Sequence, residues 1–312
     1  VAPAMLKKKT RGLLPAPEYA LACMVEGALV DYDTATRIES RYLARLWTGP
    51  VAHNMINTFF FNMNAIKSGQ SRPQGVPRGK LSKVGILGAG MMGSGIAYAQ
   101  ASKGLSTVLK DVSLEAAERG KAYSAKLTQA RVDKGRMSAD QQSALLDRIH
   151  ATDKAADLAG CELIIEAVFE NRELKAKVTQ EAEAQLATGG FFASNTSTLP
   201  ISGLATASTK PEKFVGIHFF SPVDKMKLVE IIRGQQTDDE TLARAFDYVQ
   251  QIGKIPIVVN DSRGFYTSRT FGTFVMEGAA MLGEGIPAAV IENAAMQCGM
   301  PVGPLAVLDE TA

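Results

Sequence analysis

The sequence contains few cysteines, and their placement excludes two kinds of cross-link. Cys23, Cys161 and Cys298 are far apart, odd in number, and have no Cys-x-x-Cys or Cys/His spacing around them. A disulfide framework needs paired cysteines and a structural zinc site needs closely spaced ligands, so neither fits and we expect no metal site. This cysteine usage favours a reducing compartment, and we expect the cytoplasm.

The sequence also lacks an excess of charge of one sign and a long apolar run. Its net charge is +2, and outside residues 7–11 the basic residues are dispersed, which argues against a nucleic-acid partner. The apolar stretch after this basic run is interrupted by prolines and a glutamate, which argues against a signal peptide. The most apolar remaining window, residues 51–66, contains His53 and several asparagines, so we expect no membrane span of about 20 apolar residues.

What the sequence does contain is a change of pattern along the chain. Residues 1–79 begin with helical periodicity, which predicts two or three helices, and end in a Gly- and Pro-rich stretch typical of a linker. Residues 80–262 alternate short β-branched runs with helical stretches, which predicts an α/β domain with a mostly parallel sheet. Residues 263–312 become helical again and stop without a terminating signal, so we expect the start of a truncated helical domain.

One helix start has a clear signature. Ser138 and Gln141 have the spacing of a capping box, in which each side chain satisfies a backbone N–H of the other residue. We expect a helix that begins there and runs to about Ile149.

The stretch "VGILGAGMMGSGIAYAQASKG" has the pattern of a dinucleotide-binding turn. A GxGxxG pattern by itself could be a flexible turn. Here the glycines Gly88, Gly90 and Gly93 follow a predicted strand and open a predicted helix, and this context makes the pattern a more specific sign of a dinucleotide site. Gly88 permits the tight turn, Gly90 lets the backbone approach a pyrophosphate, and Gly93 lets the helix pack close to the strand. We therefore expect a doubly wound sheet of the Rossmann type.

An acidic residue follows at the end of the second predicted strand. Asp111 lies about twenty residues beyond Gly90, where a carboxylate accepts hydrogen bonds from the ribose hydroxyls and repels a 2′-phosphate. The cofactor expected here is NAD rather than NADP. Lys110 weakens this preference, because it brings a positive charge next to the carboxylate.

A histidine and a glutamate in two later strands suggest acid–base chemistry. His218 lies at the end of the strand "FVGIHFF", and Glu230 interrupts the apolar strand "LVEII", where an unpaired carboxylate would be costly. A pairing would remove that cost and fix the imidazole tautomer, leaving the other ring nitrogen to take a proton. The alternative is a hydrogen-bonded pair with a structural role only.

Five segments together resemble one enzyme family. "GILGAGMMGSGIA", "EAVFENRELK", "ASNTSTLPI", "GIHFFSPVDKMKLVEII" and "RGFYTSR" occur in this order, and the chain from residue 80 onward resembles the L-3-hydroxyacyl-CoA dehydrogenases. The resemblance implies NAD-dependent oxidation of (S)-3-hydroxyacyl-CoA to 3-oxoacyl-CoA in fatty-acid β-oxidation. The stretch "FFFNMNAIKSGQSRPQGV" resembles the linker of the multifunctional fatty-acid oxidation α-subunit, which implies that the chain is a central fragment of such an enzyme.

The resemblance also implies roles for single residues. The catalytic histidine of the family corresponds to His218, its glutamate partner to Glu230, and the serine that hydrogen-bonds the reacting oxygen of the substrate to Ser197. Beside the glycines and Asp111, the residues expected at NAD are Met92, Glu170 and Lys175. As alternatives, Ser197 and Glu170 could each cap a nearby helix.

Two positions depart from the family pattern. Ser268 stands where many members carry an asparagine before the arginine of the last motif, and Ser221 stands where many carry an asparagine after "HFF". Serine is shorter than asparagine, so the contact that Ser268 makes with substrate would be weaker or mediated by water.

The resemblance further implies a homodimer through the helical C-terminal domain and a thiolase β-subunit as a partner. Two other interpretations stay open. The chain could be a free-standing dehydrogenase of short substrates such as 3-hydroxybutyryl-CoA, or a cofactor-binding and assembly fragment that is inactive because its helical domain is truncated.

Overall fold

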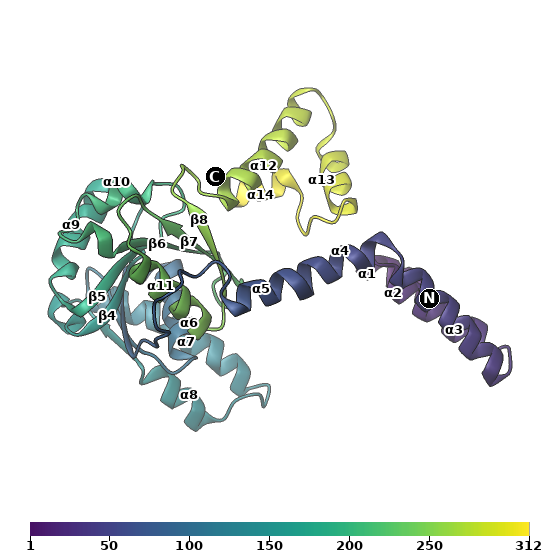
Figure 1. Cartoon of the computed structure of the whole chain (residues 1–312), viewed down its shortest axis with the longest axis horizontal. Helices are drawn as coiled ribbons and strands as arrows, with labels where there is room; N and C mark the ends of the chain where they lie inside the picture. The colour runs from purple at the N-terminus through teal and green to yellow at the C-terminus, as the bar shows by residue number, and fades with distance from the viewer. Residues whose placement is uncertain (312) are drawn as a thin grey trace. The chain divides into compact units, whose positions relative to one another are not determined.

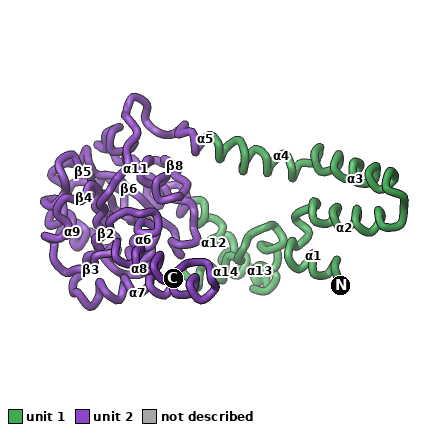
Figure 2. Tube along the Cα trace, turned by 90° about the horizontal axis from the view of Figure 1, so that it is seen from below, with its two compact units in different colours: residues 1–65, 270–312 green, residues 66–269 purple. Residues whose placement is uncertain are grey.

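The computed structural model describes residues 1–311, and side chains up to residue 310 (Figure 1). The chain forms two compact units, which Figure 2 shows in different colours. One consists of residues 66–269, and the other of residues 1–65 together with the residues from 270 onward. Each unit is described by itself below.

The larger unit is built on one sheet of eight strands. The strand order is β3-β2-β1-β4-β5-β6-β7-β8. Neighbouring strands are parallel except for β6 and β7, which are antiparallel, so the expected mostly parallel Rossmann-type sheet is confirmed. The strands are β1 Lys83–Leu87, β2 Ser106–Lys110, β3 Ile149–Thr152, β4 Cys161–Glu166, β5 Leu186–Ser194, β6 Phe214–Phe219, β7 Leu228–Arg233 and β8 Ile255–Asn260.

Helices cover both faces of this sheet (Figure 1). On one face α6 and α11 complete an apolar core with Ile96 and Phe246, and on the other face α9 and α10 complete a second core with Ala182 and Ile201. Burial of these apolar side chains on both faces is the main favourable contribution to the fold. The helices of this unit are α6 Met91–Ala101, α7 Leu114–Val132, α8 Ala139–Leu146, α9 Arg172–Glu183, α10 Ile201–Ala205 and α11 Asp239–Gln251, with short 3₁₀ turns at Ala155–Leu158 and Pro211–Lys213.

The capping box before α8 is present, but the expected end of the helix is wrong. The backbone N–H of Gln141 donates to Ser138 Oγ at 3.1 Å, and the N–H of Ser138 donates to Gln141 Oε1 at 3.0 Å. The helix ends at Leu146, and Ile149 instead begins β3. Ile149 pairs with Thr107 of β2 and is 1% exposed, so a ladder with a strand distant in sequence ends the helical pattern.

The stretch with linker composition, within residues 66–79, is hydrogen-bonded to α11. Arg72 donates to both carboxylate oxygens of Asp247, from Nε at 2.7 Å and from Nη2 at 2.8 Å. The N–H of Gly79 donates to the same carboxylate at 3.1 Å. Residues 66–79 therefore belong to the larger unit through specific contacts.

The described residues of the smaller unit form helices joined by turns. This unit is formed by α1 Ala2–Thr10, α2 Pro15–Gly27, α3 Tyr32–Trp47, α4 Pro50–Ile56, a π-helical stretch Asn57–Asn62, α5 Met63–Ser68, α12 Thr267–Gly283, α13 Ala288–Gln297 and α14 Pro304–Thr311, of which α5 and α12 continue into the larger unit.

The N-terminal stretch contains more helices than the two or three expected. One missed break lies between α2 and α3, where Asp31 accepts from the N–H of Thr34 at 2.9 Å and so starts a new helix. Arg11 donates to the carbonyls of Met296 and Met300, which ties the turn after α1 to the end of α13. None of the helices formed by the described residues is long and apolar enough to span a bilayer.

Candidate functional site

The predicted site residues gather at one edge of the sheet. The glycine-rich turn follows β1, Glu170 follows β4, Ser197 follows β5, and His218 is near the end of β6. Because these strands are parallel, their carboxyl ends lie at the same edge, which is where ligands bind in open α/β sheets.

The glycine-rich turn fits a pyrophosphate. Gly88 has φ +94°, and a Cβ there would lie 2.7 Å from the carbonyl oxygen of Ala167. A Cβ on Gly93 would overlap the carbonyl oxygen of Gly88. Gly90 is different, because a Cβ there would meet no protein atom within 4 Å. Gly90 is the N-cap of α6 and supplies no side-chain cap, so the first N–H groups of this helix face an open approach suited to an anion.

Asp111 lies beside this turn. Its two carboxylate oxygens accept from the N–H of Ala89 and from that of Val112, each at 2.6 Å, and each oxygen keeps a lone pair for a further donor. Lys110, expected to weaken the preference for NAD, is paired with Glu181 at 3.6 Å and is largely buried. Its charge is therefore engaged by α9 rather than directed at Asp111.

Met92 occupies the second position of α6, and its side chain packs on the apolar core. Only its backbone N–H is placed to serve an anion at the helix N-terminus.

His218 and Glu230 face each other across the antiparallel pair β6–β7. His218 Nδ1 is 2.7 Å from Glu230 Oε2, and the Glu230 side chain is fully buried, with 0% exposed. Burial raises the pKa of Glu230, but hydrogen bonds from His218 and Thr267 outweigh burial and hold the pKa below its ordinary value. The carboxylate is therefore ionised at neutral pH. His218 Nε2 has no hydrogen-bond partner among the described residues, and the imidazole is 8% exposed.

Glu170 organises the loop that carries Ser197. Its Oε1 accepts from the hydroxyl of Thr196 and from the N–H of Ser197 at 3.2 Å. Burial raises the pKa of Glu170, but the hydrogen bond from Thr196 and the charge of Lys175 lower it below the ordinary value. Lys175 is only 2% exposed, and its Nζ lies 3.1 Å from Glu170 and 2.7 Å from Glu166. This ammonium joins two carboxylates and thereby fixes the loop.

Neither of the alternative capping roles is found. Helix α9 is capped by Asn171, whose Oδ1 accepts from the N–H of Leu174 at 2.9 Å, and not by Glu170. The N–H groups at the start of α10 donate to Asp261, at 2.6 Å from Ile201, and not to Ser197.

The serines at the two departures lie at this edge of the sheet. Ser268 Oγ donates to the carbonyl oxygen of Ser197 at 3.4 Å, so these two predicted substrate contacts are adjacent. Ser221 Oγ is 3.6 Å from the sulfur of Met91, at the first position of α6. No hydrogen bond joins Ser197 to His218 within the described part of the chain.

Sequence reasoning missed several residues that shape the site. Thr267 donates to Glu230 from its backbone and from its hydroxyl, although it stands inside the quoted motif "RGFYTSR". Glu166 is 1% exposed and accepts from Ser194 Oγ at 2.7 Å. Glu166 is the last residue of β4 and interrupts the apolar run "LIIEAVF" of the sequence, and this signal could have identified it. Asn195 Oδ1 accepts from the N–H of Phe219 at 2.8 Å and ties the end of β5 to β6.

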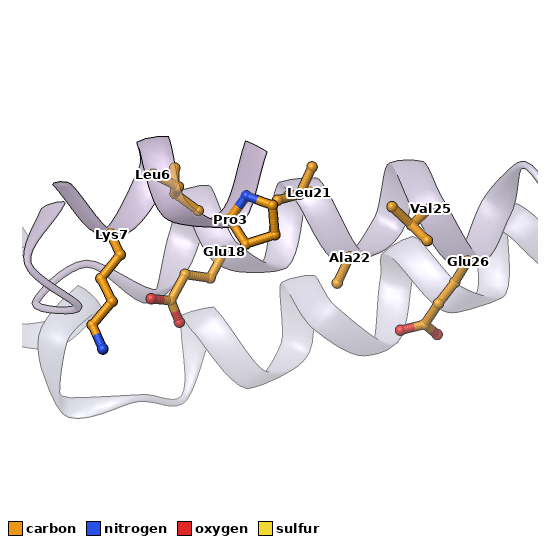
Figure 3. A pocket seen from close by; sticks show the side chains of 8 residues that line it. All are labelled: Pro3, Leu6, Lys7, Glu18, Leu21, Ala22, Val25 and Glu26. Carbon is orange, nitrogen blue, oxygen red and sulfur yellow. The ribbon is translucent and has the colours of Figure 1, made fainter. Parts of the chain in front are cut away.

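A groove of about 520 Å³ lies elsewhere, between α1 and α2 of the smaller unit (Figure 3). It contains none of the predicted site residues and has no pair of acid–base groups comparable to His218 and Glu230. We therefore place the candidate site at the edge of the sheet. The residues that line the groove are Pro3, Leu6, Lys7, Glu18, Leu21, Ala22, Val25 and Glu26.

Two parts of the chain match domains of one known enzyme. Residues 83–262 match the NAD-binding domain of 3-hydroxyacyl-CoA dehydrogenase, and residues 264–312 match the C-terminal domain of the same enzyme. The (S)-3-hydroxybutyryl-CoA dehydrogenase of Ralstonia eutropha is 37% identical with a TM-score of 0.71, over 74% of this chain and 82% of that protein. The 3-hydroxybutyryl-CoA dehydrogenase of Escherichia coli K12 is 31% identical with a TM-score of 0.69, over 73% of this chain and 49% of that protein.

A third solved structure shares the fold only. The dehydrogenase part of multifunctional enzyme 1 from C. elegans is 23% identical with a TM-score of 0.58, over 80% of this chain and 60% of that protein. The match to the NAD-binding domain spans more than half of the sequence, and it includes the glycine-rich turn, Asp111 and the His218–Glu230 pair. The chain therefore belongs to the 3-hydroxyacyl-CoA dehydrogenase family and contains the NAD-binding domain of that family.

Proposed function

We propose that this protein oxidises (S)-3-hydroxyacyl-CoA to 3-oxoacyl-CoA with NAD, as part of fatty-acid β-oxidation. The observation that supports this best is the His218–Glu230 pair, in which a buried ionised carboxylate holds one imidazole nitrogen and leaves the other without a partner among the described residues. His218, near the end of β6, is at the same edge of the sheet as the glycine-rich turn, which supports an acid–base group and a cofactor site at one edge.

The open approach at Gly90 and the position of Asp111 beside the glycine-rich turn support NAD binding there. Gly90 and the N-terminus of α6 would receive the pyrophosphate, and Asp111 would accept from the ribose hydroxyls. Glu170 and Lys175 would line the site further along the edge, beside the loop of Ser197. When bound, NAD accepts the hydride that leaves C3 of the substrate.

The proton of the 3-hydroxyl must leave at the same time, and His218 Nε2 would take it as general base. Glu230 would then stabilise the imidazolium through its hydrogen bond to Nδ1. The hydroxyl of Ser197 would hold the reacting oxygen, and Ser268, which adjoins Ser197, would contact the substrate carbonyl.

The direct test is NADH formation by the purified chain with (S)-3-hydroxyacyl-CoA substrates from short to long acyl chains. We expect NADH absorbance to rise with at least one chain length. Absence of NADH with every substrate, in a preparation that binds NAD, would contradict the proposed activity and favour a cofactor-binding and assembly role.

Two contexts for this activity are proposed. In the first, the chain is part of a multifunctional fatty-acid oxidation α-subunit. It would form a homodimer through its helical C-terminal domain and would have a thiolase β-subunit as partner. The helices within residues 1–79, which lie outside both family domains, favour this context. In the second, it is a free-standing dehydrogenase of 3-hydroxybutyryl-CoA, the substrate that the Ralstonia relative is named for. Preference for a four-carbon acyl chain would favour the second context. The expected cytoplasmic location stays a prediction.

A further inference from the structure

The carboxylate of Glu230 has more hydrogen-bond donors than a histidine partner alone provides. Oε2 accepts from His218 Nδ1 and from the hydroxyl of Thr267, each at 2.7 Å. Oε1 accepts from the N–H of Tyr266 at 3.1 Å and from the N–H of Thr267 at 2.9 Å. Thr267 and His218 therefore share one oxygen atom of the carboxylate.

The backbone conformation of the turn before Thr267 directs these N–H donors toward Glu230. Gly264 and Phe265 both have left-handed backbone conformations, with φ of +75° and +49°. That conformation is unfavourable for a bulky residue such as Phe265 and is kept only where the surrounding structure enforces it. The ring of Phe265 is buried and its centroid is 6.0 Å from that of His218. This anchored turn directs the next two N–H groups to Glu230, as a turn does for a bound anion.

We propose that Thr267 is a positioning residue of this site, whose hydroxyl competes with His218 for Glu230 Oε2 and so sets the pH at which His218 becomes a base. The inference rests on the proposed function for its catalytic consequence. The hydrogen bonds that carry it are independent of any ligand.

The direction of the effect follows from charge. The hydroxyl of Thr267 takes up part of the negative charge of Oε2 that would otherwise attract the proton on His218 Nδ1. Without this hydroxyl the imidazolium is stabilised, so His218 keeps its second proton to a higher pH. Oxidation needs the neutral imidazole, and its acidic limb should therefore move to higher pH.

Two charged side chains in the neighbouring segments have partners of their own. Strand β8, which flanks β7, contributes no titratable side chain. In the first turn of α12, Arg269 donates to Ser262 Oγ at 3.1 Å. In the neighbouring loop, Glu170 is paired with Lys175. Removal of the Thr267 hydroxyl therefore takes one donor away from Glu230 Oε2 and leaves every charged group in place.

The experiment compares Thr267→Val with Thr267→Ser in the full chain. Thr267→Val keeps the shape of the side chain and loses its hydroxyl, and Thr267→Ser keeps the hydroxyl. We expect the midpoint of the acidic limb of kcat/KM to rise by roughly half a unit to one unit in Thr267→Val, the order set by loss of one hydrogen bond to a carboxylate. Thr267→Ser should restore the wild-type midpoint. Thr273→Val is the control, because the Thr273 hydroxyl donates to the carbonyl of Thr270 and not to Glu230.

A second measurement needs neither substrate nor cofactor. The NMR titration of the imidazole of His218, identified by its loss in His218→Asn among three histidines, should show the same upward shift in Thr267→Val. If that variant does not fold, Thr267→Ala takes its place. An unchanged imidazole titration, or equal shifts in Thr267→Val and Thr267→Ser, would overturn the proposal. A wild-type chain that forms no NADH would contradict the proposed function instead, and the titration would still decide the role of Thr267.

Discussion

His218 and Glu230 are directly opposite each other in an antiparallel pair, so the register of two strands places the imidazole against the carboxylate. Loss of a general base typically lowers a rate by about 10²–10⁴-fold. We expect His218→Ala to lower the turnover of 3-hydroxyacyl-CoA by that factor and to leave NAD affinity nearly unchanged, because the glycine-rich turn is built by β1 and α6. Initial rates and calorimetry of NAD binding measure the two effects. Turnover within a few-fold of wild type would show that another group takes the proton.

The preference for NAD over NADP also depends on a single residue, Asp111. We expect the wild-type chain to bind NAD more tightly than NADP, because the Asp111 carboxylate repels a 2′-phosphate. Asp111→Asn should narrow the ratio of the two affinities measured by calorimetry. Lys110→Ala is the matched control and should leave the ratio unchanged, since the Lys110 ammonium is paired with Glu181. Equal affinities in the wild type would refute the role given to Asp111, and the fold would be unaffected.

At the scale of the element, the turn between β1 and α6 contains glycines with separate functions. Gly90 has an extended backbone and open space around its position, so the Gly90→Val variant should fold nearly as stably as wild type. Its affinity for NAD should fall by more than about tenfold, or 1.4 kcal/mol. Gly93→Val should instead destabilise the fold by about 1–3 kcal/mol or more, because its Cβ would overlap the Gly88 carbonyl. Urea unfolding and calorimetry separate the two effects, and unchanged NAD affinity in Gly90→Val would make the turn purely structural.

The elements also show how far sequence reasoning reaches. The strands other than β3 were predictable because their apolar, β-branched runs are short and bounded, and the start of α8 was predictable because its capping box is local. The end of α8 was not, since Ile149 is drawn into a ladder with β2, a contact that no local pattern encodes. For the same reason the hydroxyl of Thr267 could not be placed on Glu230, although the pairing of Glu230 with His218 could be inferred from the cost of an unpaired carboxylate.

At the scale of the molecule, the candidate site follows from strand direction. Six of the strands run in the same sense, β1 to β6, so residues far apart in sequence meet at one edge of the sheet. A parallel sheet was predicted, and the convergence of Gly88, Ser197 and His218 follows from it. The fastening of residues 66–79 could not be predicted, because Arg72 and Asp247 are separated by 175 positions in sequence and the composition of this stretch is that of a flexible linker.

The Arg72–Asp247 ion pair should therefore contribute to the stability of the larger unit. Both side chains are largely buried, 7% and 6% exposed, so Arg72→Ala leaves a buried carboxylate without its positive partner and should cost about 3–5 kcal/mol in the free energy of unfolding. Arg119→Ala breaks an exposed pair with Glu115 in the same unit and should cost at most about 1 kcal/mol. Urea unfolding measures both.

Arg72→Ala should also expose residues 68–79 to limited proteolysis, because Arg72 also donates to the carbonyls of Val76 and Pro77 and so holds this stretch in place. The double variant Arg72→Met with Asp247→Leu removes both charges. It therefore separates the cost of leaving one buried charge without its partner from the cost of losing the ion pair. It should recover most of the stability, since apolar side chains of similar size can replace a buried ion pair, and yet it should stay sensitive to proteolysis because the carbonyl contacts are lost. If Arg72→Ala is as stable and as protease-resistant as Arg119→Ala, the stretch is held by other contacts and the ion pair is incidental.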